Sequence, residues 1–271
     1  MEHAANTLTK QDLYIRGHRR HHRTIGILRI LVFLVFLALW EGSVRLGVLD
    51  SFFFSSPTLV VRTCIDLWLQ NDLATHIGIT VIETLLSFSL VTLLSMVIAC
   101  LLWFSRSFSE VCEPYLVILN SLPKSALAPL FIVWLGTGMD TIIVAGISVA
   151  VFGAIISIYS GFRQASEEKQ NLIYTLGGSR TDIFCLVVLP SSVPLLLSTM
   201  KVNIGLSLVG VIIGEFLAAR RGLGYLIIYG SQVFKLHMVI SSILILCLIA
   251  FGLYRLIQGV EHLMKKHMHL A

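Results

Sequence analysis

The chain has 271 residues, of which 56% are hydrophobic and 13% are charged, and its mean hydropathy is +0.87. This composition exceeds what a water-soluble domain needs to fill its core and is typical of an integral membrane protein. The formal net charge of +5 is not gathered into a basic stripe on a foldable soluble domain, which excludes nucleic acid as an expected partner. We interpret the charge as a signal for orientation in a membrane.

Six apolar stretches are long enough to be transmembrane helices. A helix needs about 20 mostly apolar residues to cross the hydrocarbon layer, and these stretches do not alternate as barrel strands do. The sequence therefore predicts an all-α, polytopic membrane protein with six transmembrane helices. A shorter amphipathic segment, 57–69, is expected to lie on the outer surface without crossing. The predicted spans are 25–46, 77–104, 112–135, 140–160, 192–217 and 238–258.

Basic residues indicate the orientation of these spans. Lys10 and four arginines precede the first span, and the positive-inside rule places that segment in the cytoplasm. Six crossings then return the C-terminal tail, with Lys265 and Lys266, to the same side. The expected organisation is a basic cytoplasmic segment (1–24), a transmembrane domain (25–260) with a cytoplasmic loop at 162–190, and a cytoplasmic tail (261–271).

Signatures of catalysis and of nucleotide or metal binding are missing from the sequence. It contains no HExxH, no GxSxG and no Gly-Lys pair, and therefore no phosphate-binding P-loop. The five cysteines are scattered without metal spacing, and the basic, histidine-containing tails are expected to bind anionic lipid headgroups. We expect no catalytic residue, no cofactor and no metal, and any ATP hydrolysis must take place on another chain.

The loop stretch YTLGGSRTDIFCLVVLP, 174–190, is polar and contains two glycines in an otherwise apolar chain. Before it, Ser166 is predicted to cap a short helix whose first turn is acidic, as the helix dipole favours. That helix is expected to end near Leu176, because Gly177 stands where a left-handed C-terminal cap favours glycine.

A second helix is predicted directly after this glycine. Ser179 to Asp182 reads S-x-x-D, a capping box that starts a helix, and Pro190 is expected to end it. Two interpretations of the resulting helix-turn-helix are open, since it can lie on the membrane surface or dock a cytoplasmic partner.

The spacing in this loop resembles that of binding-protein-dependent ABC importer permeases. Gly177, nine residues, Val187, one residue and Leu189-Pro190 match the pattern E-A-A-x3-G-x9-I-x-L-P, with Val187 in place of its Ile and Asn-Leu-Ile in place of Glu-Ala-Ala. The stretches SLPKSALAPLFIVWLGTG (121–138) and VGVIIGEFLAARRGLGYLI (209–227) resemble permeases of the sulfonate, taurine, nitrate and pyrimidine-precursor group. The resemblance covers roughly residues 50–265. Glu83 departs from it, because the group often has arginine there.

The resemblance implies the type I ABC importer permease fold in a bacterial plasma (inner) membrane. It implies a path for a small, anionic or heterocyclic solute of the sulfonate, nitrate, taurine or thiamine-precursor class. The implied partners, besides membrane lipid, are a second copy of the chain, cytosolic ABC ATPase subunits and an extracellular or periplasmic solute-binding protein. The residues implied to couple to the ATPase are Tyr174, Leu176, Gly177, Gly178, Ser179, Asp182, Leu189 and Pro190.

Asn203, Ser207, Gly210 and Gly214 recur on one face of the fifth predicted span. A polar stripe is costly against lipid, so it should face protein or water. The G-x-x-x-G spacing also permits close approach of two helix backbones. Two interpretations are open: the stripe lines the path or the dimer face, or it packs against another helix of the same copy.

Lys124 lies between Pro123 and Pro129, which are expected to kink the third span. An ionisable residue within a span is a functional candidate. If Lys124 faces the path, its charge favours anionic solutes. Alternatively, the side chain extends to the cytoplasmic surface.

Glu215 lies near the outer end of the fifth span, just before Arg220 and Arg221. It can pair with one of these arginines and brace an outer gate along the path. The arginines can otherwise meet acidic residues of a delivery protein, or serve as simple surface charges.

A secondary transporter driven by an ion gradient is the alternative function. Such proteins often contain inverted repeats with broken helices in matching positions of the two halves. Here the break expected around Pro123 and Pro129 has no evident counterpart, which favours the importer permease.

Overall fold

The computed structural model describes residues 10–70 and 72–267, and within these ranges all regular structure is helical. The long helices are α1 (Lys10–Arg45), α4 (Leu73–Phe104), α7 (Met139–Arg163), α10 (Leu189–Ala218) and α12 (Leu236–His267). The shorter ones are α2 (Ser51–Phe54), α3 (Pro57–Gln70), α5 (Arg106–Ser121), α6 (Lys124–Leu135), α8 (Glu167–Thr175), α9 (Arg180–Ile183), the π-helical turn η1 (Phe184–Val188) and α11 (Leu223–Gln232).

The described helices supply the expected number of membrane crossings. Five helical segments are long and apolar enough to span a bilayer, and the bent pair α5 and α6 makes a sixth when it is counted as one span. The all-α, six-span prediction is therefore confirmed. The segment predicted as an amphipathic surface helix is α3, which is not among the five spans.

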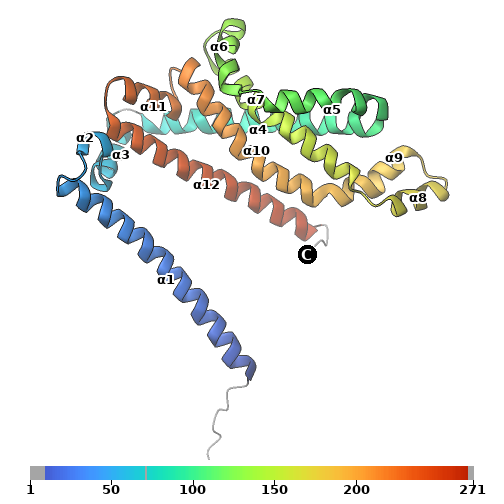
Figure 1. Ribbon diagram of the computed structural model, residues 1–271, viewed down its shortest axis with the longest axis horizontal. Coiled ribbons are helices and arrows are strands. Elements are labelled where there is room, and N and C mark those ends of the chain that lie inside the picture. Colours follow the sequence, from blue (N-terminus) through green and yellow to red (C-terminus); the bar gives the residue numbers. More distant parts are fainter. Residues whose placement is uncertain (1–9, 71, 268–271) are drawn as a thin grey trace, which may run out of the picture.

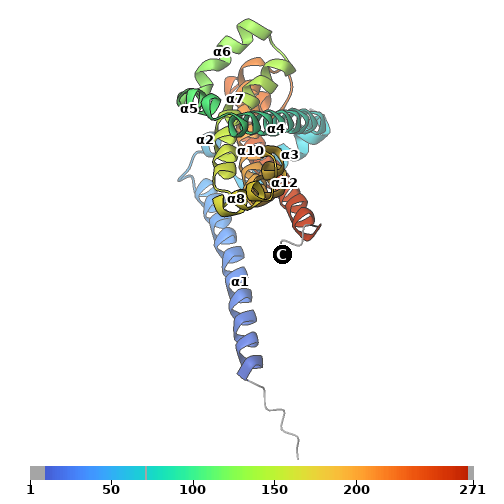
Figure 2. The ribbon, with the colours of Figure 1, turned by 90° about the vertical axis from the view of Figure 1, so that its right-hand side faces the viewer.

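Helices α4, α7 and α10 form the packed centre of the molecule, with α12 alongside (Figure 1). One cluster of buried side chains joins Val91 and Leu102 of α4 to Ala154 and Ile155 of α7. Figure 1 places α8 and α9 at one end of this bundle and α11 at the other, and Figure 2 views the bundle from the α8 end. The two ends of the bundle therefore carry different loops, and each contains candidate functional residues.

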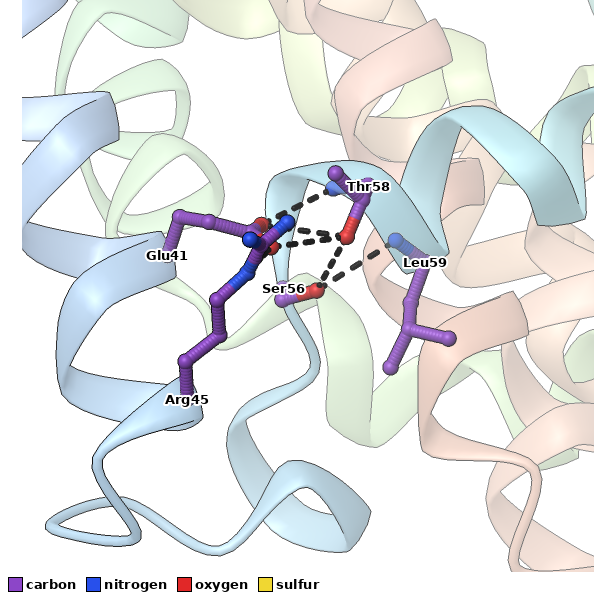
Figure 3. Close-up of polar contacts among 5 residues, drawn as sticks. All are labelled: Glu41, Arg45, Ser56, Thr58 and Leu59. Carbon is purple, nitrogen blue, oxygen red and sulfur yellow. Dashed lines mark hydrogen bonds and ion pairs between the residues drawn. The ribbon is translucent and has the colours of Figure 1, made fainter.

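Helix α1 extends away from the bundle (Figure 1), and the apolar segment 27–45 is 0% buried within the chain. Its end is held by polar contacts. The Trp40 indole donates to the carbonyl oxygen of Phe54 at 3.2 Å. Glu41 pairs with Arg45 at 2.7 Å and accepts from the Thr58 hydroxyl at 2.9 Å (Figure 3). These bonds fix α1 to α2 and α3 and leave the remaining apolar surface of α1 for lipid or another protein.

The third span differs from the prediction of one kinked helix over 112–135. Helices α5 and α6 are separate and meet at an angle of 95°. The break lies at Leu122, whose φ of −63° and ψ of 140° are extended, because a residue that precedes proline avoids the helical region. Pro129 lies inside α6 without interrupting it. Pro123 therefore accounts for the break, and Pro129 lies within the helix that follows it.

Pro190 does not end the second loop helix, so that prediction is wrong. Residues 180–218 form one continuous helical segment in which the turn from Phe184 to Val188 is π-helical. The Leu189 N–H donates to the carbonyl oxygen of Phe184, five residues back. In a regular α-helix a proline ring clashes with the carbonyl four residues earlier. The wider π turn relieves that clash, and the helix continues past Pro190.

Candidate functional sites at the two ends of the bundle

The loop predicted at 162–190 contains the short helix that the sequence predicts. Its part between α7 and α9, residues 164–179, is called the coupling loop below, after the role that the resemblance implies for it. The Ser166 hydroxyl accepts a hydrogen bond from the Lys169 N–H at 3.4 Å, and α8 follows with two acidic residues in its first turn. The helix ends at Thr175, one residue before the predicted end at Leu176. Both the cap and the helix are confirmed.

Two glycines close this helix in a Schellman motif. Gly177 has φ +84°, and its N–H donates to Tyr174 O at 3.0 Å. The Gly178 N–H donates to Ile173 O at 2.9 Å. A Cβ on Gly177 would meet no atom within 4 Å, so glycine is favoured here by the left-handed backbone and not by crowding.

The capping box after the glycines is also present. The Ser179 N–H donates to Asp182 Oδ2 at 2.8 Å, and the Asp182 N–H donates to Ser179 Oγ at 3.2 Å. Both bonds satisfy N–H groups that have no partner at the start of a helix. They fix the direction in which the chain enters the long segment that contains α10.

The loop exposes apolar side chains above a base that Arg180 anchors to Trp103. Leu172, Tyr174 and Leu176 are 59%, 74% and 75% exposed. At the base, the Arg180 guanidinium donates to Trp103 O at 3.0 Å and lies 5.3 Å from the centre of the Trp103 ring. Sequence reasoning missed this anchor, because Trp103 lies 77 residues earlier in the chain. Leu189 is half-buried and Pro190 is exposed.

At the opposite end, Glu215 is fully buried and holds the turn between α10 and α11. Glu215 Oε1 accepts from the Thr80 hydroxyl at 2.6 Å, and Oε2 accepts from the Gly224 N–H. Thr80 Oγ1 in turn accepts from the Leu223 N–H at 2.9 Å. The Gly222 N–H donates to His76 Nδ1 at 2.9 Å. One face of α4 thus fixes the α10–α11 turn, through His76 directly and through Thr80 together with the Glu215 carboxylate of α10.

The turn needs glycine because it wraps closely around this carboxylate. A Cβ on Gly222, whose φ is +116°, would lie 2.5 Å from the carboxylate of Glu215. The predicted pairing of Glu215 with Arg220 or Arg221 is not observed, since both carboxylate oxygens bond to Thr80 and Gly224 instead and both arginines are exposed. Backbone N–H groups of a tight turn reach the buried carboxylate where the arginine side chains do not.

Glu215→Gln is expected to destabilise the folded protein. The amide would present N–H hydrogens to the Thr80 hydroxyl or to the Gly224 N–H, and an unsatisfied buried donor costs about 1–3 kcal/mol. The thermal unfolding temperature of the purified protein should fall. Glu110→Gln is the matched control, because Glu110 belongs to an exposed ion pair with Arg106, and such pairs contribute about 0–1 kcal/mol. Equal unfolding temperatures for Glu215→Gln and wild type would contradict a structural role for the carboxylate.

The predicted polar stripe of the fifth span packs inside the chain. Asn203, Ser207, Gly210 and Gly214 are all buried. A Cβ on Gly210 would lie 2.7 Å from Gly146 Cα of α7, and one on Gly214 would lie 2.8 Å from Ile142 Cα. Of the two interpretations of this stripe, close packing between helices of one copy accounts for both glycines.

Lys124 lies at the elbow between α5 and α6. Its ammonium group donates to Leu119 O at 2.9 Å and to Asn120 O, carbonyls at the C-terminal end of α5. A cation is favourable there, because the carbonyls of the last helical turn lack partners within the helix. Lys124 therefore caps the C-terminal end of α5 at the break in the third span. Neither interpretation of the sequence included this role.

Residues 91–265 match the family described as the binding-protein-dependent transport system inner membrane component. The chain belongs to this family. The match spans the coupling loop and the Glu215 turn, whereas His76 and Thr80, which bond to that turn, lie before its first residue. The protein is accordingly the permease subunit of an ABC importer and a multi-pass membrane protein.

Related proteins match this permease over most of its length. A probable ABC transporter permease protein of Haemophilus influenzae is 30% identical over 86% of this chain and 94% of its own length. A formylaminopyrimidine transport permease protein of Halalkalibacterium halodurans is 27% identical over 72% and 77%. A putative aliphatic sulfonates transport permease protein of Bacillus subtilis is 26% identical over 91% and 90%. The relatives thus include the group that the sequence motifs resemble.

Solved structures share the fold of this permease. The methionine ABC transporter in an inward-facing conformation matches with a TM-score of 0.62 and 18% identity, over 74% of this chain and 97% of that chain. An amino acid ABC transporter matches with a TM-score of 0.55 and 14% identity, over 72% and 92%. At these identities the likeness concerns the fold alone, which is the type I importer fold.

Proposed function

We propose that this permease works as a homodimer whose two copies enclose the solute path, with separate cytosolic ATPase subunits bound to the coupling loops. Exposed apolar surface supports the dimer. The α6 side chains Val133 and Trp134 are 80% and 67% exposed, and α6 turns away from the bundle after the 95° elbow. A second copy that packs against α6 would cover this surface.

The coupling loop gives the strongest support for the proposal. Three exposed apolar side chains, Leu172, Tyr174 and Leu176, lie on a loop that two capping motifs and Arg180 hold rigid. Rigid attachment matters because a docking element must pass motion to the spans rather than absorb it. Switching between inward-open and outward-open states needs a partner whose binding differs between them. ATPase subunits that close on ATP would supply that difference.

The proposed orientation follows from the coupling loop. Cytosolic ATPase subunits require α8 and α9 on the cytoplasmic side of a bacterial plasma membrane. An even number of crossings then keeps both termini in the cytoplasm, in agreement with the basic residues before α1. The α10–α11 turn faces outward, where a solute-binding protein would deliver the cargo.

The solute class that we propose is narrower than the description of the family. Relatives are described as transporting formylaminopyrimidine, aliphatic sulfonates and taurine, all small molecules with polar or charged groups. These descriptions support a small anionic or heterocyclic solute for this permease. We expect the binding protein to make most of the selection before the solute reaches the chain.

Reconstitution tests this function against ion-driven uptake. The permease would be placed in proteoliposomes with its cognate ATPase inside and its binding protein outside. We expect solute accumulation that requires internal ATP and persists when ionophores collapse proton and sodium gradients. Uptake that continues without ATP and stops with ionophores would instead establish a secondary transporter.

A further inference from the structure

Two glutamate side chains meet inside the bundle, at the end opposite the coupling loop. Thr80 and Glu83 lie three residues apart on α4 and therefore share one face of that helix. The Thr80 hydroxyl donates to Glu215 Oε1 of α10 at 2.6 Å, which brings this face of α4 against Glu215. The side chain of Glu83 hydrogen-bonds to the same carboxyl. Glu83 and Glu215, the carboxyl pair, are 3% and 0% exposed, so bulk water solvates neither of them.

The hydrogen bond within the carboxyl pair requires a proton. An ionised carboxyl only accepts hydrogen bonds, whereas a protonated one has an O–H group that donates. Two ionised carboxyls in contact would repel each other, and burial weakens the screening of that repulsion. Within residues 10–70 and 72–267, no ion pair joins either carboxyl to a basic side chain. One member of the pair is therefore protonated.

The surrounding hydrogen bonds place this proton on Glu83. Glu215 accepts from the Thr80 hydroxyl and from the Gly224 N–H, and donors of this kind favour the charged form of a carboxyl. Glu83 has no comparable set, because its Oε2 atom is buried without a hydrogen-bond partner among the described residues. A neutral carboxyl tolerates such burial far better than an ionised one. Glu83 is thus the donor, and Glu215 is the ionised acceptor.

The proton of Glu83 has a route to the surrounding medium. Glu83 lines a cavity of about 550 Å³ between the start of α4, the turn between α6 and α7 and the end of α10. Arg220 and Arg221 line the same cavity and are exposed. When the O–H bond of Glu83 breaks, the proton passes to water in this cavity. Two buried carboxylates are then left side by side.

We propose that the proton shared by the carboxyl pair holds α4 against the turn between α10 and α11, and that this end of the bundle is therefore sensitive to pH. Glu215 bonds to Gly224 of that turn, and Thr80 bonds to Leu223. Separation of α4 from Glu215 would therefore release the turn as well. The stabilisation is present while Glu83 keeps its proton and is lost as the medium becomes alkaline. The proposal goes beyond the transport function and does not depend on it.

Other charged or titratable side chains surround the carboxyl pair. His76 lies on the same face of α4 and accepts from the Gly222 N–H. The arginines of the turn are exposed, and salt screens charges of this kind. A comparison of wild type with a Glu83 variant at the same pH cancels these contributions, because both proteins carry them. The groups are His76 of α4, Asp140 of α7, Arg220 and Arg221 of the turn, and Tyr225 of α11.

Infrared spectroscopy detects the shared proton directly. The full-length permease would be purified in a detergent without ester groups and measured at neutral pH, with and without an isotopic label in the glutamate carboxyl carbon. A protonated acid has a C=O stretch separate from that of a carboxylate, and the label distinguishes it from residual lipid esters. Among the described residues, Glu83 and Glu215 are the acidic side chains that are buried. We therefore expect a label-sensitive acid band in the wild type, and its absence would overturn the proposal.

Two variants assign this band. Glu83→Gln should lose it, because the amide donates to Glu215 in place of the O–H group. Glu110→Gln should keep it, since Glu110 is an exposed carboxylate paired with Arg106. A band that persists unchanged in Glu83→Gln would also overturn the proposal.

The pH profile of stability tests the effect on the fold. Glu83→Gln keeps the hydrogen bond to Glu215 at every pH and gains no charge in alkaline medium. Wild type and Glu83→Gln should unfold at similar temperatures at neutral pH, and the wild type should fall below the variant as the pH rises. Identical profiles would overturn the proposal. If Glu83→Gln is not recovered folded, the wild-type acid band must fade over the pH range in which the unfolding temperature falls. A fall in that temperature without loss of the band would contradict the proposal equally.

Discussion

Gly177→Val is expected to reduce ATP hydrolysis stimulated by the loaded binding protein at least about tenfold, while the permease remains in the membrane. Gly177 has φ +84°, and a residue with a Cβ pays about 1–2 kcal/mol in the left-handed region. A β-branched residue is disfavoured further there. The chain avoids this cost by abandoning the Schellman turn, which reorients α8 relative to α9.

The loss of coupling would come from the strained backbone conformation and not from a steric clash, because a Cβ at position 177 meets no atom within 4 Å. Gly47→Val is the matched control, since Gly47 has φ +72° and equally open surroundings but lies between α1 and α2. It should carry similar backbone strain and retain stimulated hydrolysis. The measurement is ATPase activity of the reconstituted complex with and without loaded binding protein. If both valine variants respond like wild type, the turn at Gly177 does not transmit coupling.

Gly210→Val is expected to destabilise the fold strongly and to lower the yield of folded permease. A Cβ at this position would lie 2.7 Å from Gly146 Cα and 2.8 Å from Ala145 O, and both are backbone atoms that cannot rotate away. Helices α7 and α10 would have to separate along their shared contact. Overpacking of a well-packed core typically costs about 1–3 kcal/mol, occasionally more, and backbone clashes belong at the upper end. We expect the yield of monodisperse protein to fall about tenfold or more.

Gly205→Val separates this clash from the general effect of valine in α10. Gly205 lies on the same helix, is exposed, and has no atom within 4 Å of an added Cβ. Its valine variant should be recovered at close to the wild-type yield. Size-exclusion chromatography of detergent-solubilised membranes measures both variants in parallel. Wild-type recovery of Gly210→Val would show that α7 and α10 do not pack as closely as described.

Features set by neighbouring residues could be predicted from the sequence. The cap at Ser166, the left-handed Gly177 and the box formed by Ser179 and Asp182 each depend on residues within one turn of a helix. Span positions likewise follow from long apolar runs. These local signals located the coupling loop before its structure was known.

Features that depend on distant contacts could not be predicted in this way. Thr80 is 135 residues from Glu215, and Trp103 is 77 residues from Arg180. The sequence offered arginines close to Glu215 and suggested an ion pair, whereas the fold brings α4 to the carboxylate instead. The effect of Pro190 could not be predicted either, because a π-helical turn before it compensates for the proline and the usual rule for proline in helices does not include such a turn.

The polar stripe shows the limit of periodicity. Spacing placed Gly210 and Gly214 on one face of a helix, and the structure agrees. Periodicity does not say what that face meets, because path, partner and neighbouring helix all favour small or polar residues. Only the positions of the helix backbones show that this face of α10 meets α7.

The most direct measurement is the composition of the complex in its native membrane. The permease would be purified in a mild detergent after chemical crosslinking, and the proteins that accompany it identified and quantified by mass spectrometry. The account predicts a P-loop ATPase in stoichiometric amounts, crosslinked to residues of the coupling loop. A crosslinked preparation that contains the permease and no ATPase would contradict it.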